Sequence, residues 1–139
     1  KAMHALTAEM CTAMLHVLEQ RPQLAVLLSS TPARAFCAGG DVKFVTQRAA
    51  LGDVGVAERF FRAEYTLDYA LAAVPRVSIL DGVCMGGGMG LCMHERDGAF
   101  SFRVATSNAV CALPECAIGL HPDVGASYFL SRLPKDSGA

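Results

Sequence analysis

Three consecutive glycines, Gly86 to Gly88, are the residues whose type and position first indicate chemistry. They follow the apolar run Val77 to Leu80 and an Asp81-Gly82 turn, and they open a stretch that predicts a helix. Inside a helix each glycine would cost about 1 kcal/mol relative to alanine, whereas at a helix start it leaves backbone N–H groups open to a ligand. These N–H groups and the helix dipole favour an anion or an oxyanion. Close helix packing would explain the same glycines, so both interpretations stay open.

A second glycine pair, Gly39-Gly40, ends a loop predicted over residues 31–41 and resembles the triplet. It is a candidate for a second backbone donor. Asp41 follows and precedes a predicted helix over residues 42–48. Its side chain therefore either caps that helix or takes part directly in chemistry.

Three acidic residues lie at positions where an acid has either a specific structural role or a role in a functional site. Glu64 falls within the apolar stripe of a helix predicted from about 56 to 73, and burying an unpaired carboxylate is costly. It therefore pairs with Arg76 or Arg103, or it lines a cavity. Glu115 is either an exposed loop acid or a site residue. Asp123 starts another predicted helix, so it is either that helix's N-cap or a second site acid.

The elements that must position these residues alternate between short strands and helices. Such alternation predicts an α/β or mixed architecture. Apolar spacing predicts helices over residues 3–17, 42–48, 56–73 and 123–133, a glycine-rich helix after the triplet, and strands over 24–30, 77–80, 99–106 and 110–113.

Composition limits the class of protein. The chain has 139 residues, of which 53% are hydrophobic and 18% charged, and we expect one globular domain over residues 1–139. A net charge of −1 argues against a general nucleic-acid or anionic-membrane surface. Glycine, proline or charge interrupts every apolar run before the roughly 18 residues of a membrane span.

Cysteine usage and motif searches exclude further classes. The six cysteines form no C-x-x-C pair, so we expect reduced and mostly buried thiols and no metal site. The chain contains no G-x-G-x-x-G, P-loop or G-x-S-x-G pattern. Dinucleotide-binding, P-loop and serine-hydrolase signatures are therefore absent.

Several segments together resemble the crotonase (enoyl-CoA hydratase/isomerase) superfamily, and their order runs across nearly the whole chain. They are Ala35-Phe36-Cys37-Ala38-Gly39-Gly40-Asp41, Asp81-Gly82 with Met85-Gly86-Gly87-Gly88, Phe102-Arg103-Val104-Ala105-Thr106, and Pro114-Glu115 with Ile118-Gly119-Leu120.

The resemblance implies a fold and a site. The fold is an α/β spiral of ββα units, of which this chain is an incomplete core without the first strands and the C-terminal helical portion. In the superfamily two backbone N–H groups form an oxyanion hole for the thioester carbonyl of a coenzyme A substrate. Here the matching donors are Gly40 and Gly87.

The acids indicate the branch of the superfamily. Hydratases carry one glutamate where this chain has Gly90 and a second where it has Glu115. The segments His121-Pro122-Asp123-Val124-Gly125 and Phe60-Phe61-Arg62-Ala63-Glu64-Tyr65 instead resemble the superfamily's hydrolases of 3-hydroxyisobutyryl-CoA, an intermediate of valine catabolism. The resemblance implies Glu115 and Asp123 as catalytic acids and Glu64 as a substrate-binding residue. It predicts hydrolysis of a short, branched 3-hydroxyacyl-CoA thioester.

Two other functions stay open: an enoyl-CoA hydratase or isomerase that uses Glu115 alone, and a non-catalytic acyl-CoA-binding or assembly subunit. We expect no cofactor, because coenzyme A is part of the substrate, and no nucleic-acid or membrane partner; a homo-oligomer stays open. The resemblance implies a mitochondrial protein if the source is eukaryotic and a cytoplasmic one if it is bacterial. No targeting segment is visible in the sequence.

Overall fold

A computed structural model describes residues 2–21, 25–30, 34–96 and 98–133. Helices and strands alternate along this part of the chain. In chain order they are η1 (Ala2–His4), α1 (Ala8–Gln20), β1 (Val26–Leu28), β2 (Ala35–Cys37), α2 (Val42–Ala50), α3 (Val56–Ala72), β3 (Arg76–Leu80), β4 (Val83–Met85), α4 (Gly87–Met93), β5 (Ser101–Ala105), β6 (Val110–Ala112), η2 (Glu115–Ile118) and α5 (Ala126–Leu130).

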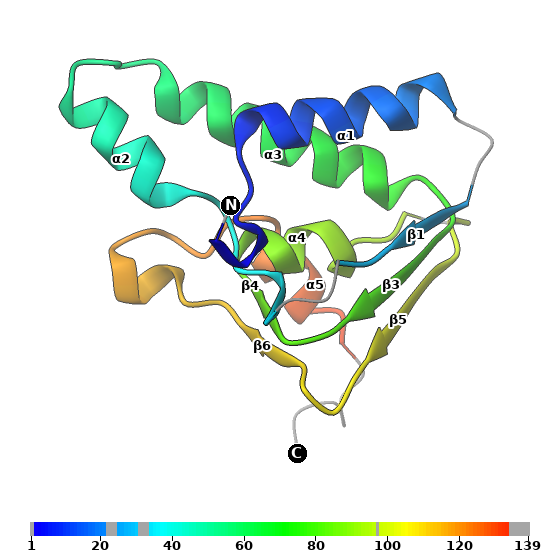
Figure 1. The fold of residues 1–139 in the computed structure, drawn as a ribbon. Helices are drawn as coiled ribbons and strands as arrows, with labels where there is room; N and C mark the ends of the chain where they lie inside the picture. The colour runs from blue at the N-terminus through cyan, green and yellow to red at the C-terminus, as the bar shows by residue number, and fades with distance from the viewer. Residues whose placement is uncertain (1, 22–24, 31–33, 97, 134–139) are drawn as a thin grey trace.

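The described chain forms three turns of a spiral. Each turn contributes two strands and then helical structure: β1, β2, α2 and α3; then β3, β4 and α4; then β5, β6, η2 and α5. The first strand of each turn joins a sheet of order β1-β3-β5, and the second joins a sheet of order β2-β4-β6 (Figure 1). This is the spiral of ββα units that the resemblance implied.

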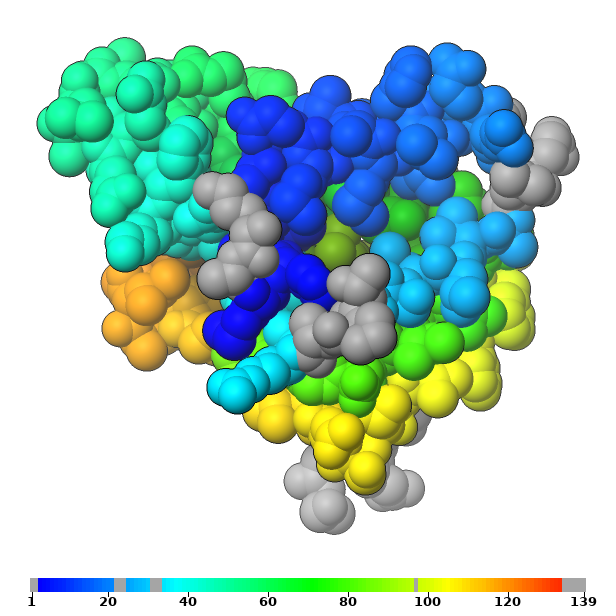
Figure 2. All heavy atoms as spheres, viewed as in Figure 1, coloured from blue at the N-terminus to red at the C-terminus, as the bar shows by residue number. Residues whose placement is uncertain are grey.

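All strand pairs within the two sheets are parallel. Val26 is opposite Arg76, Val77 is opposite Phe102, and Met85 is opposite Ala112. In the space-filling view the segments of β1, β3 and β5 form successive bands in light blue, green and yellow (Figure 2). Because parallel pairing needs a crossover, each turn passes through helical structure before the next strand of the same sheet begins.

Helix α3 lies between α1 and α4 and provides much of the core (Figure 1). It follows Gly55 and keeps an apolar stripe at helical spacing over 17 residues. Two acids share this stripe with the apolar residues. Its buried residues are Val56, Phe60, Glu64, Leu67, Asp68, Leu71 and Ala72.

The buried Arg76 joins two helices to the first sheet. Its guanidinium donates to the carbonyl oxygens of Leu71, at the end of α3, and of Cys92 and His94, at the end of α4. The last carbonyls of a helix lack intrahelical partners and carry partial negative charge, so a cation is favourable there. Burial lowers the pKa of Arg76, although the guanidinium stays protonated at neutral pH.

The sequence predictions of helices agree with the structure better than those of strands. Thr7 caps α1 through a bond from Met10 N, and Asp41 caps α2 through a bond from Phe44 N at 3.1 Å, which confirms the capping interpretation of Asp41. The last predicted helix is shorter than expected and begins at residue 126.

Two strands were missed. β2 lies within the predicted loop over 31–41, and β4 follows the Asp-Gly turn directly. β1 is shorter than the predicted strand over 24–30 and is only partly buried. A three-residue strand is too short to show a two-residue period. The sequence pattern of such a strand is therefore easily assigned to a loop or to the start of a helix. Residues 24 and 31–33 of these predictions lie outside the described residues.

Three further expectations concern thiols, metals and membranes. All six cysteines are free, four of them buried. Within the described ranges, His, Cys, Asp and Glu form no group of three placed to hold a metal ion. None of the helices described there is long and apolar enough to cross a membrane.

Replacing Leu67 by Ala tests the central place of α3. Leu67 is fully buried in the hydrophobic core, so its loss should lower the free energy of unfolding by about 2–5 kcal/mol. Urea denaturation followed by circular dichroism measures the change. Leu51→Ala, at a residue with a 78% exposed side chain, is the control and should change stability by less than about 0.5 kcal/mol. Equal effects of the two substitutions would contradict the assignment of the core.

Candidate active site

The two glycine segments predicted to supply backbone donors lie side by side. A Cβ placed on Gly87 would be 3.3 Å from the Gly40 nitrogen, and one placed on Gly39 would be 3.5 Å from the Gly87 nitrogen. Gly39 and Gly86 have φ values of 97° and 49°, a region that a side chain disfavours. No described residue accepts a hydrogen bond from the N–H of Gly40 or Gly87. Both donors are therefore available to a ligand.

Gly88 has a different role from its neighbour. A Cβ on Gly88 would lie 2.5 Å from the carbonyl oxygen of Cys37 in β2. The third glycine of the triplet thus allows α4 to pack on the sheet. The packing interpretation is confirmed for Gly88, and the ligand-binding interpretation of Gly87 stays a prediction.

Glu64 reaches the glycine helix from α3. A Cβ on Gly87 would overlap the Glu64 Oε1 atom, and one on Gly40 would lie 3.6 Å from it. Glu64 is 2% exposed, and Oε1 accepts no hydrogen bond from a described residue. The alternative that Glu64 pairs with Arg76 or Arg103 is wrong, because both guanidinium groups bind the Cys92 carbonyl instead.

Glu115 approaches the same glycines from the third turn. The Gly86 N–H donates to Ala112 O at 3.1 Å, so the end of β6 is tied to the start of α4. The chain then enters η2, where Glu115 Oε1 lies 2.7 Å from the position of a Gly86 Cβ. Glu115 is 4% exposed, so the alternative of an exposed loop acid is wrong.

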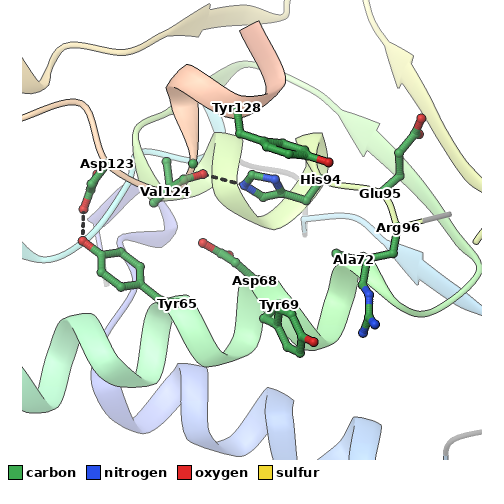
Figure 3. A pocket seen from close by; sticks show the side chains of 11 residues that line it. Tyr65, Asp68, Tyr69, Ala72, His94, Glu95, Arg96, Asp123, Val124 and Tyr128 are labelled. Carbon is green, nitrogen blue, oxygen red and sulfur yellow. Dashed lines mark hydrogen bonds between the residues drawn. The ribbon is translucent and has the colours of Figure 1, made fainter. Parts of the chain in front are cut away.

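Asp123 faces α3 across the site (Figure 3). The hydroxyl of Tyr65 donates to Asp123 Oδ2 at 2.6 Å. Helix α5 begins after Gly125 with no side-chain cap, so the capping interpretation of Asp123 is wrong. Burial and this hydrogen bond both raise the pKa of Tyr65, which keeps its hydroxyl protonated as a donor.

One cavity of about 70 Å³ brings the predicted residues together. Its lining includes all five of them: Gly40, Glu64, Gly87, Glu115 and Asp123. Asp123 and Val124 border a second and larger cavity of about 550 Å³ between α3 and α5, with Tyr65, Asp68 and His94 on its walls (Figure 3). Asp123 therefore separates the two cavities.

Asp68 is a site-bordering acid that the sequence prediction missed. It lies one helical turn after Glu64 on the same face of α3 and is 5% exposed. A Cβ on Gly90 would lie 2.5 Å from Asp68 Oδ2, so the missing side chain at Gly90 makes room for this carboxyl. The helical-wheel argument applied to Glu64 would also have found Asp68.

Burial and mutual repulsion raise the pKa values of both α3 acids. The pKa of Glu64 rises to about 8 because it is buried and because Asp68, Asp123 and Glu115 lie nearby. The pKa of Asp68 also rises to about 8, through burial and then through Asp123. Both carboxyls are therefore largely neutral at pH 7 and can donate hydrogen bonds.

Comparison with known proteins identifies the family. The profile of the enoyl-CoA hydratase/isomerase family matches residues 1–139, so the chain belongs to this family. It is 45% identical over 139 residues to probable 3-hydroxyisobutyryl-CoA hydrolase 3 of Arabidopsis thaliana, and the match covers 96% of this chain and 35% of that protein. Vertebrate relatives named 3-hydroxyisobutyryl-CoA hydrolase are described as mitochondrial.

A solved structure and a relative from another class add to the comparison. The crystal structure of a carnitinyl-CoA dehydratase from Mycobacterium thermoresistibile matches with a TM-score of 0.80 and 40% identity, over 94% of this chain and 38% of that one. Small ribosomal subunit protein mS47 of Neurospora crassa is 42% identical over 117 residues, covering 81% of this chain and 22% of that protein. The chain spans about a third or less of the length of the curated relatives it matches.

Asp68→Asn tests the raised pKa through stability. A buried acid that stays protonated in the folded state but ionises in the unfolded state makes the folded protein bind more protons between about pH 4 and pH 8. Stability contributed this way is present at low pH and falls as pH rises, by up to about 1.4 kcal/mol per pH unit. Asn cannot ionise, so the variant should lose stability less steeply between pH 5 and pH 8. Urea midpoints at each pH measure the slope.

Glu58→Gln is the matched control for this measurement. Glu58 lies on α3 but is exposed and paired with Arg62. Its substitution should leave the slope unchanged. A slope for Asp68→Asn equal to that of the parent would refute a neutral Asp68 at pH 7.

Proposed function

We propose that the complete protein hydrolyses a short, branched 3-hydroxyacyl-CoA thioester, with 3-hydroxyisobutyryl-CoA of valine catabolism as the substrate. The observation that carries this proposal is the convergence of Glu115 and Asp123 with two unpaired backbone N–H groups on one cavity. Relatives at 42–47% identity with the hydrolase name support the substrate.

The N–H groups of Gly40 and Gly87 form the oxyanion hole of this mechanism. Attack on a thioester carbonyl moves negative charge onto its oxygen, and fixed donors stabilise that charge most strongly in the transition state. Losing one such donor costs on the order of 100-fold or more in rate. A Cβ on Gly87 would lie 3.3 Å from the Gly40 nitrogen, so the two glycines are direct neighbours, which supports the assignment.

Glu115 is the group that starts the reaction, by one of two routes. As a general base it takes a proton from water, whose oxygen then attacks the carbonyl carbon. As a nucleophile its carboxylate attacks directly and forms an acyl-enzyme anhydride, which water then hydrolyses. In both routes the carbon–sulfur bond breaks and the coenzyme A thiolate takes up a proton.

Asp123 and Glu64 bind and orient the substrate. The Tyr65 hydroxyl holds one oxygen of Asp123, which leaves the other to accept a hydrogen bond from the substrate hydroxyl or to share a proton transfer. Glu64, neutral at pH 7, donates a hydrogen bond to that hydroxyl without adding a second negative charge next to Glu115. This mechanism needs no cofactor beyond the coenzyme A of the substrate.

The enzymatic alternative is an enoyl-CoA hydratase or isomerase with Glu115 as its acid. This reaction would add water to crotonyl-CoA without releasing a thiol. Gly90 weighs against it, because the space beside this residue already contains Asp68 Oδ2 and the Val124 Cβ. An acid at position 90 would clash with both.

The alternative from another class is a binding or assembly subunit. The similarity to a ribosomal subunit protein favours it, because that relative carries a name without an enzymatic activity. Tight coenzyme A binding without turnover of any thioester would indicate this function. The buried Glu115 and the bonded Asp123 weigh towards an enzyme.

The compartment follows the source of the protein. In a eukaryote we propose a mitochondrial location, since vertebrate relatives are mitochondrial. In a bacterium we propose the cytoplasm.

Glu115→Gln in the complete protein tests the proposed activity. It removes the base or nucleophile while keeping the shape of the side chain, so free coenzyme A release from 3-hydroxyisobutyryl-CoA should fall by about 10²–10⁴-fold. A thiol reagent measures the release, and circular dichroism checks the fold. The exposed Glu58→Gln is again the control and should keep the parent rate. Near-parent turnover by folded Glu115→Gln would rule out this role, and hydration of crotonyl-CoA by the parent would favour the hydratase.

A further inference from the structure

The loop that carries Asp123 contains a strained residue. Val124 has a φ of 43°, in the left-handed region, which is rare for a β-branched side chain. It is also 4% exposed, so the strain does not come from a loose surface turn. A residue keeps such a conformation only where its surroundings fix it.

His94 provides one of the contacts that fix it. Its Nε2 atom lies 2.5 Å from the carbonyl oxygen of Val124 (Figure 3). A carbonyl only accepts, so Nε2 carries the proton of this hydrogen bond. A Cβ on Gly125 would lie 2.9 Å from the same nitrogen, so the imidazole packs directly on the bare backbone of Gly125.

His94 is itself held at both ends. Its carbonyl oxygen accepts a hydrogen bond from the buried Arg76, which also binds the ends of α3 and α4. Its ring meets the ring of Phe129 edge-on, with 5.6 Å between centroids. The imidazole therefore connects the end of α4 to the loop that carries Asp123.

The conformation of Val124 determines where Asp123 lies. The Asp123 carboxylate meets the Tyr65 hydroxyl at 2.6 Å, and the next peptide is the one that Val124 holds in its unusual conformation. The Val124 side chain packs beside Gly90, 2.9 Å from the position of a Cβ there. Relaxation of Val124 to a negative φ would rotate this peptide and withdraw Asp123 from Tyr65.

We propose that His94 is a positioning residue for Asp123: its Nε2–H keeps Val124 in the left-handed conformation that presents the Asp123 carboxylate to the site. This inference rests on the proposed function, in which Asp123 acts on the substrate. His94 does not line the cavity of about 70 Å³ that the predicted site residues share, so it acts on this site through Val124 and Asp123.

A double-mutant cycle in the complete protein tests the inference. His94→Phe keeps an aromatic ring against Phe129 but removes the donor. It should lower kcat/KM for 3-hydroxyisobutyryl-CoA by about 10- to 100-fold, because a misplacement of about 1 Å at a reacting group has an effect of this size. In an Asp123→Asn background the same change should have little further effect, because the two residues act through one carboxylate.

Two further variants make the test specific. Val124→Gly adopts a positive φ without strain, so adding it to His94→Phe should return part of the lost activity. His121→Ala is the matched control, because His121 is an exposed histidine two residues before Asp123 and should leave the rate unchanged. An equal loss from His94→Phe in both backgrounds, or a parent rate for folded His94→Phe, would overturn the inference.

A crystal structure of His94→Phe separates this inference from the proposed function. If Asp123→Asn keeps full activity, the proposed role of Asp123 fails, and the positioning role is then judged from the coordinates alone. A negative φ at Val124 with a broken Tyr65–Asp123 contact supports it. An unchanged loop overturns it. If His94→Phe does not fold, His94→Gln enters the same cycle and should keep most of the activity, because its amide still donates; a full loss in folded His94→Gln would overturn the inference.

Discussion

The close approach of α3 to α4 is the constraint on which the rest of the structure depends. Glu64 and Asp68, one helical turn apart on α3, face Gly87 and Gly90 on α4. A side chain on either glycine would occupy the space that a carboxyl now fills. The two glycines therefore let two acids enter the core, and the same absence of side chains leaves the Gly87 N–H open to the cavity.

This approach also determines the electrostatics of the site. Burial and the nearby acids Asp123 and Glu115 raise the free energy of ionising Glu64 and Asp68. Both carboxyls are therefore largely protonated at neutral pH. The buried Arg76, whose guanidinium binds helix-terminal carbonyls, lowers the pKa of Asp68, but burial and the nearby Asp123 outweigh this effect. In the proposed mechanism the site thus keeps hydrogen-bond donors on α3, opposite Glu115 and Asp123 on the third turn of the spiral.

How much the sequence predicted depended on the length of each pattern. Long α3 could be predicted because its stripe repeats over several turns, and Glu64 stood out against that stripe. The three-residue strands β2 and β4 could not, since parallel pairing with distant segments defines them. The contacts Tyr65–Asp123 and His94–Val124 join residues 58 and 30 positions apart, and no local period encodes them. The helical-wheel argument that singled out Glu64 would also have identified Asp68.

The spiral topology has a consequence for the order in which the molecule assembles. Within the described ranges, no strand pairs with the strand next to it in the chain. Val26 pairs with Arg76, about fifty residues later. Contacts between residues far apart in the chain form only after a long loop has closed. The entropy lost in closing that loop slows folding. As the chain emerges in synthesis, the pair of backbone donors can form once the second turn closes, before Glu115 and Asp123 have been made. Until the third turn has been made, Asp123 cannot meet Tyr65 and Val124 cannot meet His94.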